Sequence, residues 1–188
     1  MRQAIDTITI GTDGPGLIEF TDRVTAWTQS TGIVSGLLTL FCRHTSASLI
    51  IQENAASAVR RDIAAYFDRI APEGDIYEHD DEGPDDMPAH LKTALTGVSL
   101  SIPVENGRPM LGTWQGIYLF EHRHHPHRRQ VALHLLGISR ERFSQHSANS
   151  LKICHNVVTD QNRSSLVPTM CVMTSATTPI PGHVETYR

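Results

Sequence analysis

A histidine and three hydroxyl side chains stand directly after an apolar run of the chain. The run ends at Cys42, and His44, Thr45, Ser46 and Ser48 follow it. A histidine there can act as a general base or bind a metal, while hydroxyls and N–H groups near a helix start can hold phosphate oxygens. The alternative is an ordinary turn whose hydroxyls satisfy backbone groups. The segment is therefore a candidate phosphate site.

A second candidate is a strongly acidic segment that ends at Asp86 and carries eight carboxylates without a lysine or arginine. His90 follows four residues later, so a helix that begins at Asp86 would place both residues on one face, as shared metal ligands or as a carboxylate that orients an imidazole. Asp85 and Asp86 favour Mg²⁺ or Mn²⁺, whereas convergence of His44, His79 and His90 would favour Zn²⁺. A solvated acidic face is the alternative.

A third candidate is Trp114 and Gln115, which stand between two glycines. Glycines in a strand either form a bulge or let a ligand approach the backbone, and the two side chains offer a stacking surface and an amide. The alternative is a bulged strand with a core tryptophan. Glu121, His122 and Arg123 end the same segment, where Arg123 could bind a phosphate with two hydrogen bonds.

Glu53 stands just before the expected second helix. A carboxylate at this place can act as a catalytic acid, or it can interact favourably with the positive end of the helix dipole. The position alone supports both roles.

The periodicity of apolar residues predicts the elements that must position these side chains. In chain order they are a strand at 4–10, a helix capped by Thr21 or Asp22, a strand at 34–42, a helix capped by Asn54, a helix at 86–95, and strands at 98–104, 110–121 and 131–136, with a hairpin turn at Asn106-Gly107. We expect the last three strands to form an antiparallel meander, and the fold class to be α+β.

Composition excludes several classes of protein. The chain has 188 residues and a net charge of −4, which argues against a nucleic-acid or anionic-membrane binder. No apolar stretch approaches the ~18 residues of a membrane span, and the three cysteines lack a Cys-x-x-Cys pair, so we expect a cytoplasmic protein with free thiols.

Residues 138–188 show no sustained period and are predicted to be a disordered or loosely attached tail on a domain at 1–137.

Three strings occur in the chain in one order: HTSAS followed by EN, then HDDEGPDDMPAH, then LGTWQGIYL followed by EHR. Over about residues 3–137 the chain resembles the YjbQ-like proteins, a family often described as secondary thiamine-phosphate synthases. The resemblance implies a mixed or antiparallel β-sandwich with two to three helices, commonly a homotrimer, and a pocket lined by the motif histidines and acids. The chain departs from the family at Ala56-Ser57, where members usually have Asp-Pro.

The activity that the resemblance implies joins an aminopyrimidine methyl diphosphate to a thiazole phosphate and releases pyrophosphate. A divalent cation, Mg²⁺ or Zn²⁺, would draw charge from the leaving group. The expected metal ligands are His79, Asp85, Asp86 and His90; the expected catalytic residues are His44, Glu53 and His90; and the expected substrate-binding residues are Thr45, Ser46, Trp114, Gln115, Glu121, His122 and Arg123. A metal-dependent phosphoester hydrolase and a non-catalytic trimeric module that binds an anionic metabolite are the alternatives.

Overall fold

The computed structural model describes residues 1–74 and 76–139, which form two antiparallel sheets and three helices. In chain order the elements are β1 (Arg2–Thr12), β2 (Gly16–Glu19), α1 (Thr21–Ser30), β3 (Ile33–Cys42), β4 (Ala47–Glu53), α2 (Ser57–Ile70), α3 (Asp86–Thr96), β5 (Ser99–Glu105), β6 (Arg108–Pro109), β7 (Gln115–Glu121) and β8 (His127–Ser139). The predicted α+β class is confirmed. Most of the predicted tail lies outside the described residues, so its character stays a prediction.

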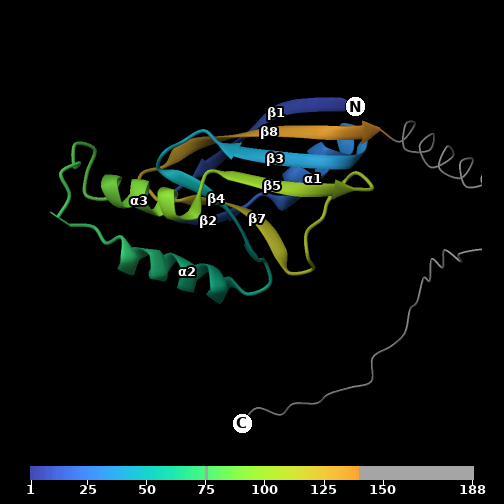
Figure 1. Ribbon diagram of the computed structural model, residues 1–188. Coiled ribbons are helices and arrows are strands. Elements are labelled where there is room, and N and C mark those ends of the chain that lie inside the picture. The colour runs from blue at the N-terminus through green and yellow to red at the C-terminus, as the bar shows by residue number, and fades with distance from the viewer. Residues whose placement is uncertain (75, 140–188) are drawn as a thin grey trace, which may run out of the picture. The chain divides into compact units, whose positions relative to one another are not determined.

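The core lies between a five-stranded sheet, in the order β1-β8-β3-β5-β6, and a three-stranded sheet, in the order β2-β7-β4 (Figure 1). Side chains alternate along each strand, so every second residue of β8 points inward, as Val131, Leu133 and Leu135 do. Leu40 of β3 and Leu119 of β7 meet them in the same apolar cluster. This arrangement confirms the antiparallel sandwich.

The prediction of a C-terminal meander is wrong. The hairpin turn at Asn106 and Gly107 forms as predicted, with φ angles of 53° and 76°, but the returning strand β6 has only two residues. Met110 still donates its N–H to the Pro103 carbonyl at 2.8 Å, but Pro103 has no N–H to donate back, so the pairing ends there and the chain crosses to the other sheet. Strand β7 then pairs with β2 and β4, while β8 lies between β1 and β3.

Two strands are missing from the prediction. β4 occupies the place where a loop was expected to lead into the second helix, and β2 is too short to show a period. Ala47, Ser48 and Leu49 at the start of β4 are all buried, so the strand shows no apolar alternation that the sequence could reveal. The residues from His44 to Ser48, here called the hydroxyl segment, therefore lead into strand β4. No helix begins directly after them.

The predicted helix caps are also wrong. Both α1 and α2 begin without a side-chain cap, at Phe20 and Ala56 respectively. The Thr21 hydroxyl instead accepts a hydrogen bond from the Ile117 N–H at 2.9 Å. Asn54 uses its backbone N–H to bond the Trp114 carbonyl at 3.0 Å.

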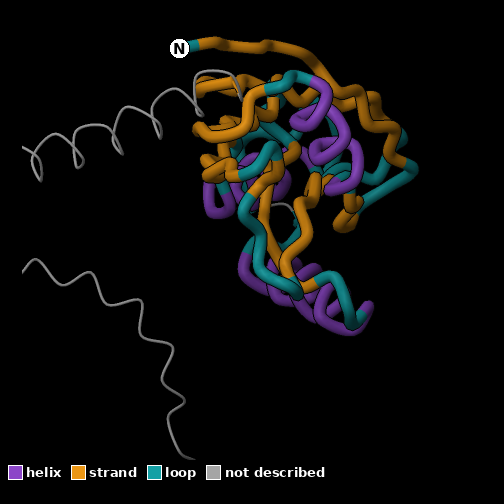
Figure 2. Tube along the Cα trace, turned by 90° about the vertical axis from the view of Figure 1, so that its right-hand side faces the viewer, coloured by secondary structure: helices purple, strands orange, loops and turns teal. Residues whose placement is uncertain are grey.

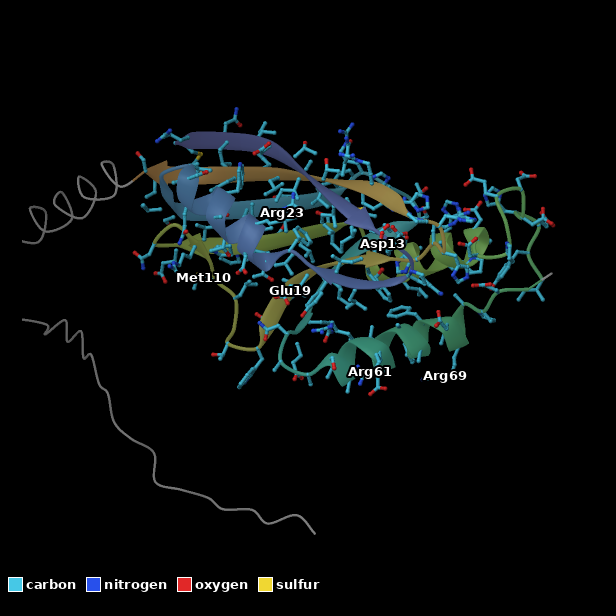
Figure 3. All side chains as sticks on the ribbon, turned by 180° about the vertical axis from the view of Figure 1, so that it is seen from behind. Asp13, Glu19, Arg23, Arg61, Arg69 and Met110 are labelled. Carbon is cyan, nitrogen blue, oxygen red and sulfur yellow. The ribbon has the colours of Figure 1, made fainter. Side chains whose placement is uncertain are left out.

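The helices occupy different positions around the sandwich. Helix α3 starts at Asp86 and ends before Gly97, as predicted. Helix α2 lies apart from the sheets in two perpendicular views (Figures 1 and 2) and has no fully buried residue. Figure 3 shows its Arg61 and Arg69 from behind. Its contacts with the body include the rings of Phe67 and Phe120, whose centroids are 5.5 Å apart. Among the described residues, no helix is long and apolar enough to cross a membrane.

The closest approach of strands β3 and β8 requires glycine. A Cβ on Gly137 would overlap the carbonyl oxygen of Ser35, and one on Gly36 would overlap that of Leu136. We therefore expect Gly137→Ala to lower the free energy of unfolding by about 1–3 kcal/mol, because the strands must separate. Gly11→Ala is the matched control, since no heavy atom lies within 4 Å of its new Cβ. Denaturant unfolding measures both, and equal stabilities would contradict the overlap.

Candidate functional site

The predicted site residues fall at opposite ends of the three-stranded sheet. Ala47 of β4 lies opposite Glu121 of β7, and Glu53 lies opposite Gln115. Six residue steps at ~3.3 Å separate these pairs by about 20 Å. The hydroxyl segment and the end of β7 therefore meet at one end, while Glu53, Trp114 and Gln115 meet at the other. No single small molecule in one chain contacts both groups.

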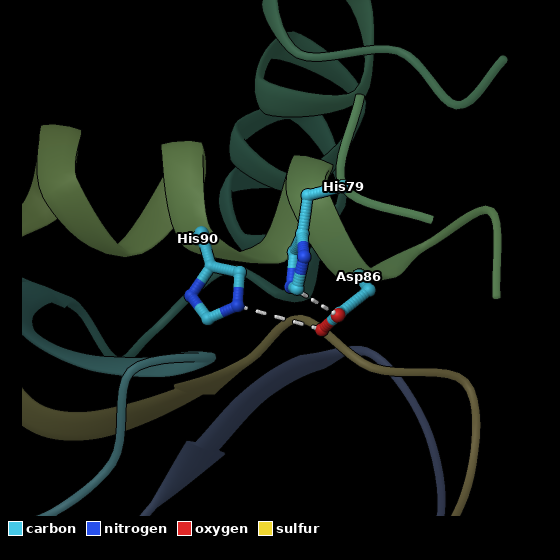
Figure 4. Close-up of side chains that lie close together, drawn as sticks. All are labelled: His79, Asp86 and His90. Carbon is cyan, nitrogen blue, oxygen red and sulfur yellow. Dashed lines mark ion pairs between the residues drawn. The ribbon is translucent and has the colours of Figure 1, made fainter. Parts of the chain in front are cut away.

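Two histidines converge on one carboxylate at the first end. Candidate ligand atoms of His79, Asp86 and His90 all lie within 4.8 Å of one another. The His79 Nε2 is 2.9 Å from Asp86 Oδ2, and the His90 Nε2 is 3.5 Å from Asp86 Oδ1 (Figure 4). His79 comes from the acidic loop, while Asp86 and His90 share a face of α3, as their spacing predicted.

The Asp86 carboxylate is buried without enough partners. Its side chain is 3% exposed, and Oδ2 makes no hydrogen bond although it lies 2.9 Å from the His79 Nε2. The Arg123 guanidinium bonds Oδ1, but it also pairs with the buried Asp85. One buried cation therefore faces two buried carboxylates. An unbalanced negative charge in such a place is costly unless a further cation binds.

The backbone orients His90 as a metal-binding group requires. Its Nδ1 lies 3.0 Å from the Thr45 carbonyl oxygen. Because a carbonyl only accepts hydrogen bonds, Nδ1 carries the hydrogen, and in the neutral ring Nε2 presents its lone pair to the cluster. A second-shell carbonyl of this kind is the usual partner of a metal-bound histidine.

The guanidinium of Arg123, the predicted phosphate clamp, is engaged by carboxylates of this chain. Its Nε donates to Asp85 Oδ2 at 3.1 Å, and its Nη1 and Nη2 donate to the side chain and backbone of Glu82 at 3.2 and 2.9 Å. Asp85 Oδ2 also accepts the His124 N–H at 2.8 Å. Burial works to raise the pKa of Asp85, but these hydrogen bonds and the Arg123 charge lower it overall. Asp85 thus holds Arg123 in place and lies outside the histidine cluster.

A cavity of about 1010 Å³ opens beside the cluster. Its lining comes from β3, the hydroxyl segment, α3 and the start of β8, and includes Phe41, Cys42, Arg43, His44, Thr45, Ser46, Glu82, His90, Thr93, Ala94, Gly97, Val98, Arg123, His127 and Arg129. Most of the polar side chains are hydrogen-bond donors, which suits an anionic ligand. The sole lining carboxylate, Glu82, is paired with Arg123.

His44 lines this cavity as a donor. Its Nε2 accepts the Gln130 N–H at 2.7 Å, so the hydrogen of the neutral ring is on Nδ1. Burial and then the charge of Arg129 lower its pKa. The backbone N–H occupies the lone pair that a general base needs, so this geometry does not suit the predicted base.

Cys42 also lines the cavity, but its thiol is inert. Burial raises its pKa to about 11, so the thiol stays protonated at neutral pH. It is a free cysteine within the described residues. The other two predicted free thiols, Cys154 and Cys171, lie outside those residues.

The sequence reasoning missed two residues of the site. Thr93 lies one turn after His90, lines the cavity, and has a buried hydroxyl without a hydrogen-bond partner. Arg129 lies on the inward face of β8 with Val131, so the period of that strand could have revealed it. An inward arginine needs a buried acceptor, which here is Glu121.

Glu121 is the hub of a buried network and is inaccessible to substrate. Its carboxylate accepts hydrogen bonds from Arg129 Nε at 2.7 Å and from Thr12 Oγ1 at 2.9 Å. The backbone N–H groups of His122 and Arg123 donate to it at 3.0 Å each. Burial works to raise the pKa of Glu121, but Arg129 and the other donors lower it overall. Glu121 therefore joins three strands at the base of the site.

His122 is buried as well, against Ser48. Its Nε2 lies 2.9 Å from the Ser48 hydroxyl oxygen, and Thr96 donates to the same oxygen at 2.6 Å. Burial, followed by the charge of Lys92, lowers the pKa of His122 to about 3. His122 is therefore a buried neutral residue outside the lining of the cavity, and this geometry does not favour its predicted role as a substrate contact.

This burial predicts a dependence of stability on pH. The unfolded chain protonates His122 below its ordinary pKa of ~6.5, whereas the folded protein does not until about 3, so acidification favours unfolding. We expect His122 alone to remove about 2 kcal/mol between pH 7 and pH 5. His122→Gln lacks the titration, so its loss over that interval should be smaller by this amount in denaturant unfolding. Equal losses in both proteins would show that His122 is protonated in the fold.

Comparisons with known proteins agree with the fold and the motifs. Residues 6–138 match the family described as UPF0047 protein YjbQ-like. A UPF0047 protein of Synechocystis is 50% identical over 137 residues, which cover 72% of this chain and 93% of that protein. The YjbQ protein of Salmonella typhimurium is 46% identical over 132 residues, covering 70% of this chain and 96% of that protein.

Solved structures give the same result. A crystal structure from Clostridium acetobutylicum, described as an uncharacterized YjbQ/UPF0047 protein, is 36% identical with a TM-score of 0.65 and covers 70% of this chain and 99% of that one. A Thermus thermophilus protein is 34% identical with a TM-score of 0.62, with coverages of 70% and 99%. The sequence match over 6–138 and these likenesses show that the chain belongs to the UPF0047 family of YjbQ-like proteins.

Proposed function

We propose that this protein is a metal-dependent enzyme that acts on a phosphorylated small molecule, with the metal held by His79, Asp86 and His90. The observation that carries the proposal is the buried Asp86 carboxylate, on which two imidazoles converge: His79 lies against Oδ2, which has no hydrogen bond, and His90 lies against Oδ1. A bound cation would satisfy that oxygen and balance the excess negative charge beside Arg123.

The donor set favours Zn²⁺ over Mg²⁺. Two imidazole nitrogens and one carboxylate are typical ligands of zinc, whereas magnesium prefers six oxygens. Since Asp85 is committed to Arg123 and His124, the second carboxylate expected for magnesium is already in use. Three protein ligands leave a coordination position open, and zinc in such sites polarises a phosphoryl oxygen or lowers the pKa of a bound water.

The cavity beside the cluster supplies groups for a phosphate. Arg43, His44, Ser46 and Thr93 are among its lining residues, and the hydrogen of the neutral His44 ring is on Nδ1. Hydrogen bonds from such donors to phosphate oxygens stabilise negative charge that develops during displacement. In this proposal these residues bind and orient the phosphate, and His90 serves as a ligand rather than as the proton shuttle.

The same cavity has room for a heterocycle. Phe41, Ala94 and Val98 form its apolar side, so a ring can rest there, while Trp114 lies at the other end of the sheet. A phosphorylated heterocycle is therefore the proposed substrate class. The first candidate reaction is a transfer like that of thiamine-phosphate synthase. The second is phosphoester hydrolysis, since the proposed open metal position can hold water.

The test starts with metal-free protein that carries no histidine tag. We expect stoichiometric Zn²⁺ by elemental analysis, weaker Mg²⁺ binding, and further thermal stabilisation by pyrophosphate or thiamine phosphate only with zinc present. Product analysis with the aminopyrimidine diphosphate, with and without the thiazole phosphate, then separates transfer from hydrolysis. Binding of zinc and phosphate without turnover of either kind would favour the binding module, and absence of zinc binding would overturn the proposal.

The homotrimer implied by the resemblance is a further part of the proposal. The outward face of the five-stranded sheet carries Ile5, Leu37 and Leu136, each more than 40% exposed. Apolar side chains gathered on an uncovered sheet face suit a contact between copies of the chain. Light scattering on the full chain measures the mass, and a monomer would contradict this part alone.

A further inference from the structure

A second cavity, of about 520 Å³, lies at the far end of the three-stranded sheet. Its lining consists of Ile51, Gln52, Glu53, Ala55, Trp114 and Gln115. We propose that this cavity binds a small organic cation, an amine or a quaternary ammonium, between the indole of Trp114 and the carboxylate of Glu53. It shares no lining residue with the cavity at the histidine cluster, so the inference stands apart from the proposed function.

Trp114 is presented by a rigid turn. Its side chain is 65% exposed, which is unusual for the largest apolar side chain. The Gly112 N–H donates to Gln115 Oε1 at 2.8 Å, and the Gln115 N–H donates back to the Gly112 carbonyl at 3.0 Å. The Asn54 N–H holds the Trp114 carbonyl itself. The backbone that carries the indole is fixed in this way, so it loses little conformational entropy when a ligand binds.

Glu53 is fixed by its backbone and has a free carboxylate. Its carbonyl accepts the Tyr118 hydroxyl at 3.2 Å, while its side chain makes no ion pair within residues 1–74 and 76–139. Arg60 does not line the cavity, and its guanidinium lies 5.9 Å from the Tyr118 ring centroid. The only ionisable side chain in the lining is therefore negative.

These features select the charge of the ligand. The face of an indole attracts cations more strongly than any other side-chain ring, and the carboxylate adds a Coulomb attraction. A phosphate or carboxylate ligand would be repelled by Glu53. One carboxylate with neutral amides is too weak a donor set for a metal ion. An alkylated ammonium satisfies the site best, because Ile51 and Ala55 can contact its methyl or methylene groups.

The test titrates the full chain with choline, tetramethylammonium and butylamine, and follows tryptophan fluorescence and heat of binding. The neutral control ligand is 3,3-dimethylbutan-1-ol, which has the shape of choline without its charge. We expect saturable binding of at least one cation and at least about tenfold weaker binding of the neutral analogue. Trp114→Leu and Glu53→Gln should each weaken cation binding by about tenfold or more.

Two controls separate the site from general effects. Glu105→Gln removes an exposed carboxylate elsewhere and should leave cation binding unchanged, and the Trp114 and Glu53 variants should bind zinc as the parent does. Binding that is insensitive to these two variants, equal affinity for the neutral analogue, or no saturable binding of any cation would overturn the proposal. A smaller mass of the assembly in solution for Trp114→Leu than for the parent would also overturn the proposal, because it would show that another copy of the chain covers the tryptophan.

Discussion

Replacement of Asp86 by asparagine is expected to weaken Zn²⁺ binding by about 100-fold or more. The change keeps the shape of the side chain but removes the anionic ligand on which both imidazoles converge. Even second-shell changes at metal sites cost about 10–100-fold in affinity, so loss of a direct ligand should cost at least as much. Competition against a chelator of known zinc affinity measures the effect in the full chain.

Three matched variants test the assignment further. Asp81→Asn removes an exposed carboxylate from the same loop and should leave zinc affinity unchanged, which controls for general loss of negative charge. His79→Ala and His90→Ala should each lose zinc while their free energies of unfolding stay within about 1–2 kcal/mol of the parent, because both side chains are partly exposed. Unchanged stoichiometric zinc in Asp86→Asn would refute the site, and collapse of His90→Ala would make His90 a structural residue.

Replacement of Arg129 by methionine is expected to lower the free energy of unfolding by about 3–5 kcal/mol at pH 7. Methionine is similar in length but leaves the Glu121 carboxylate, which is fully buried, without its charged partner. The Thr12 hydroxyl and two backbone N–H groups remain as donors, but they carry no positive charge. Removal of one partner of a buried pair is costly because the other charge stays out of water.

The control for Arg129→Met is Arg128→Met on the same strand. Arg128 is exposed on the other face of β8, so its replacement should change stability by less than about 0.5 kcal/mol. The double variant Arg129→Met with Glu121→Gln should recover part of the loss, since it removes the stranded charge. Denaturant unfolding at pH 7 measures all three. A loss below about 1 kcal/mol in Arg129→Met would mean that Glu121 does not depend on the arginine.

The sequence alone determined the features that depend on near neighbours. Alternation predicted β5, β-rich or apolar runs predicted β1, β3 and β8, and the pair Asn106-Gly107 predicted its turn. The four-residue spacing placed Asp86 and His90 on one helix face, and the histidine in the preceding loop joined them as expected. These features could be predicted because period, turn residues and helix starts are short-range properties of the chain.

The roles of the charged residues needed the tertiary structure. Arg123 is attractive as a phosphate clamp until Asp85 and Asp86, almost forty positions earlier, are seen to occupy its guanidinium. His122 looks like a pocket residue until Ser48 is found to cover it. A charged side chain acts according to its partners, and these partners come from distant parts of the sequence.

The division of the motifs between two ends of one sheet was likewise decided only in three dimensions. Trp114 and Arg123 are nine residues apart and belong to one motif, yet a seven-residue extended strand between them separates a tryptophan cavity from the histidine cluster. The hairpin turn and the apolar run after it identified a strand but could not say which sheet it joins. Sheet pairing is set by long-range contacts with β2 and β4, and local periodicity carries no information about them.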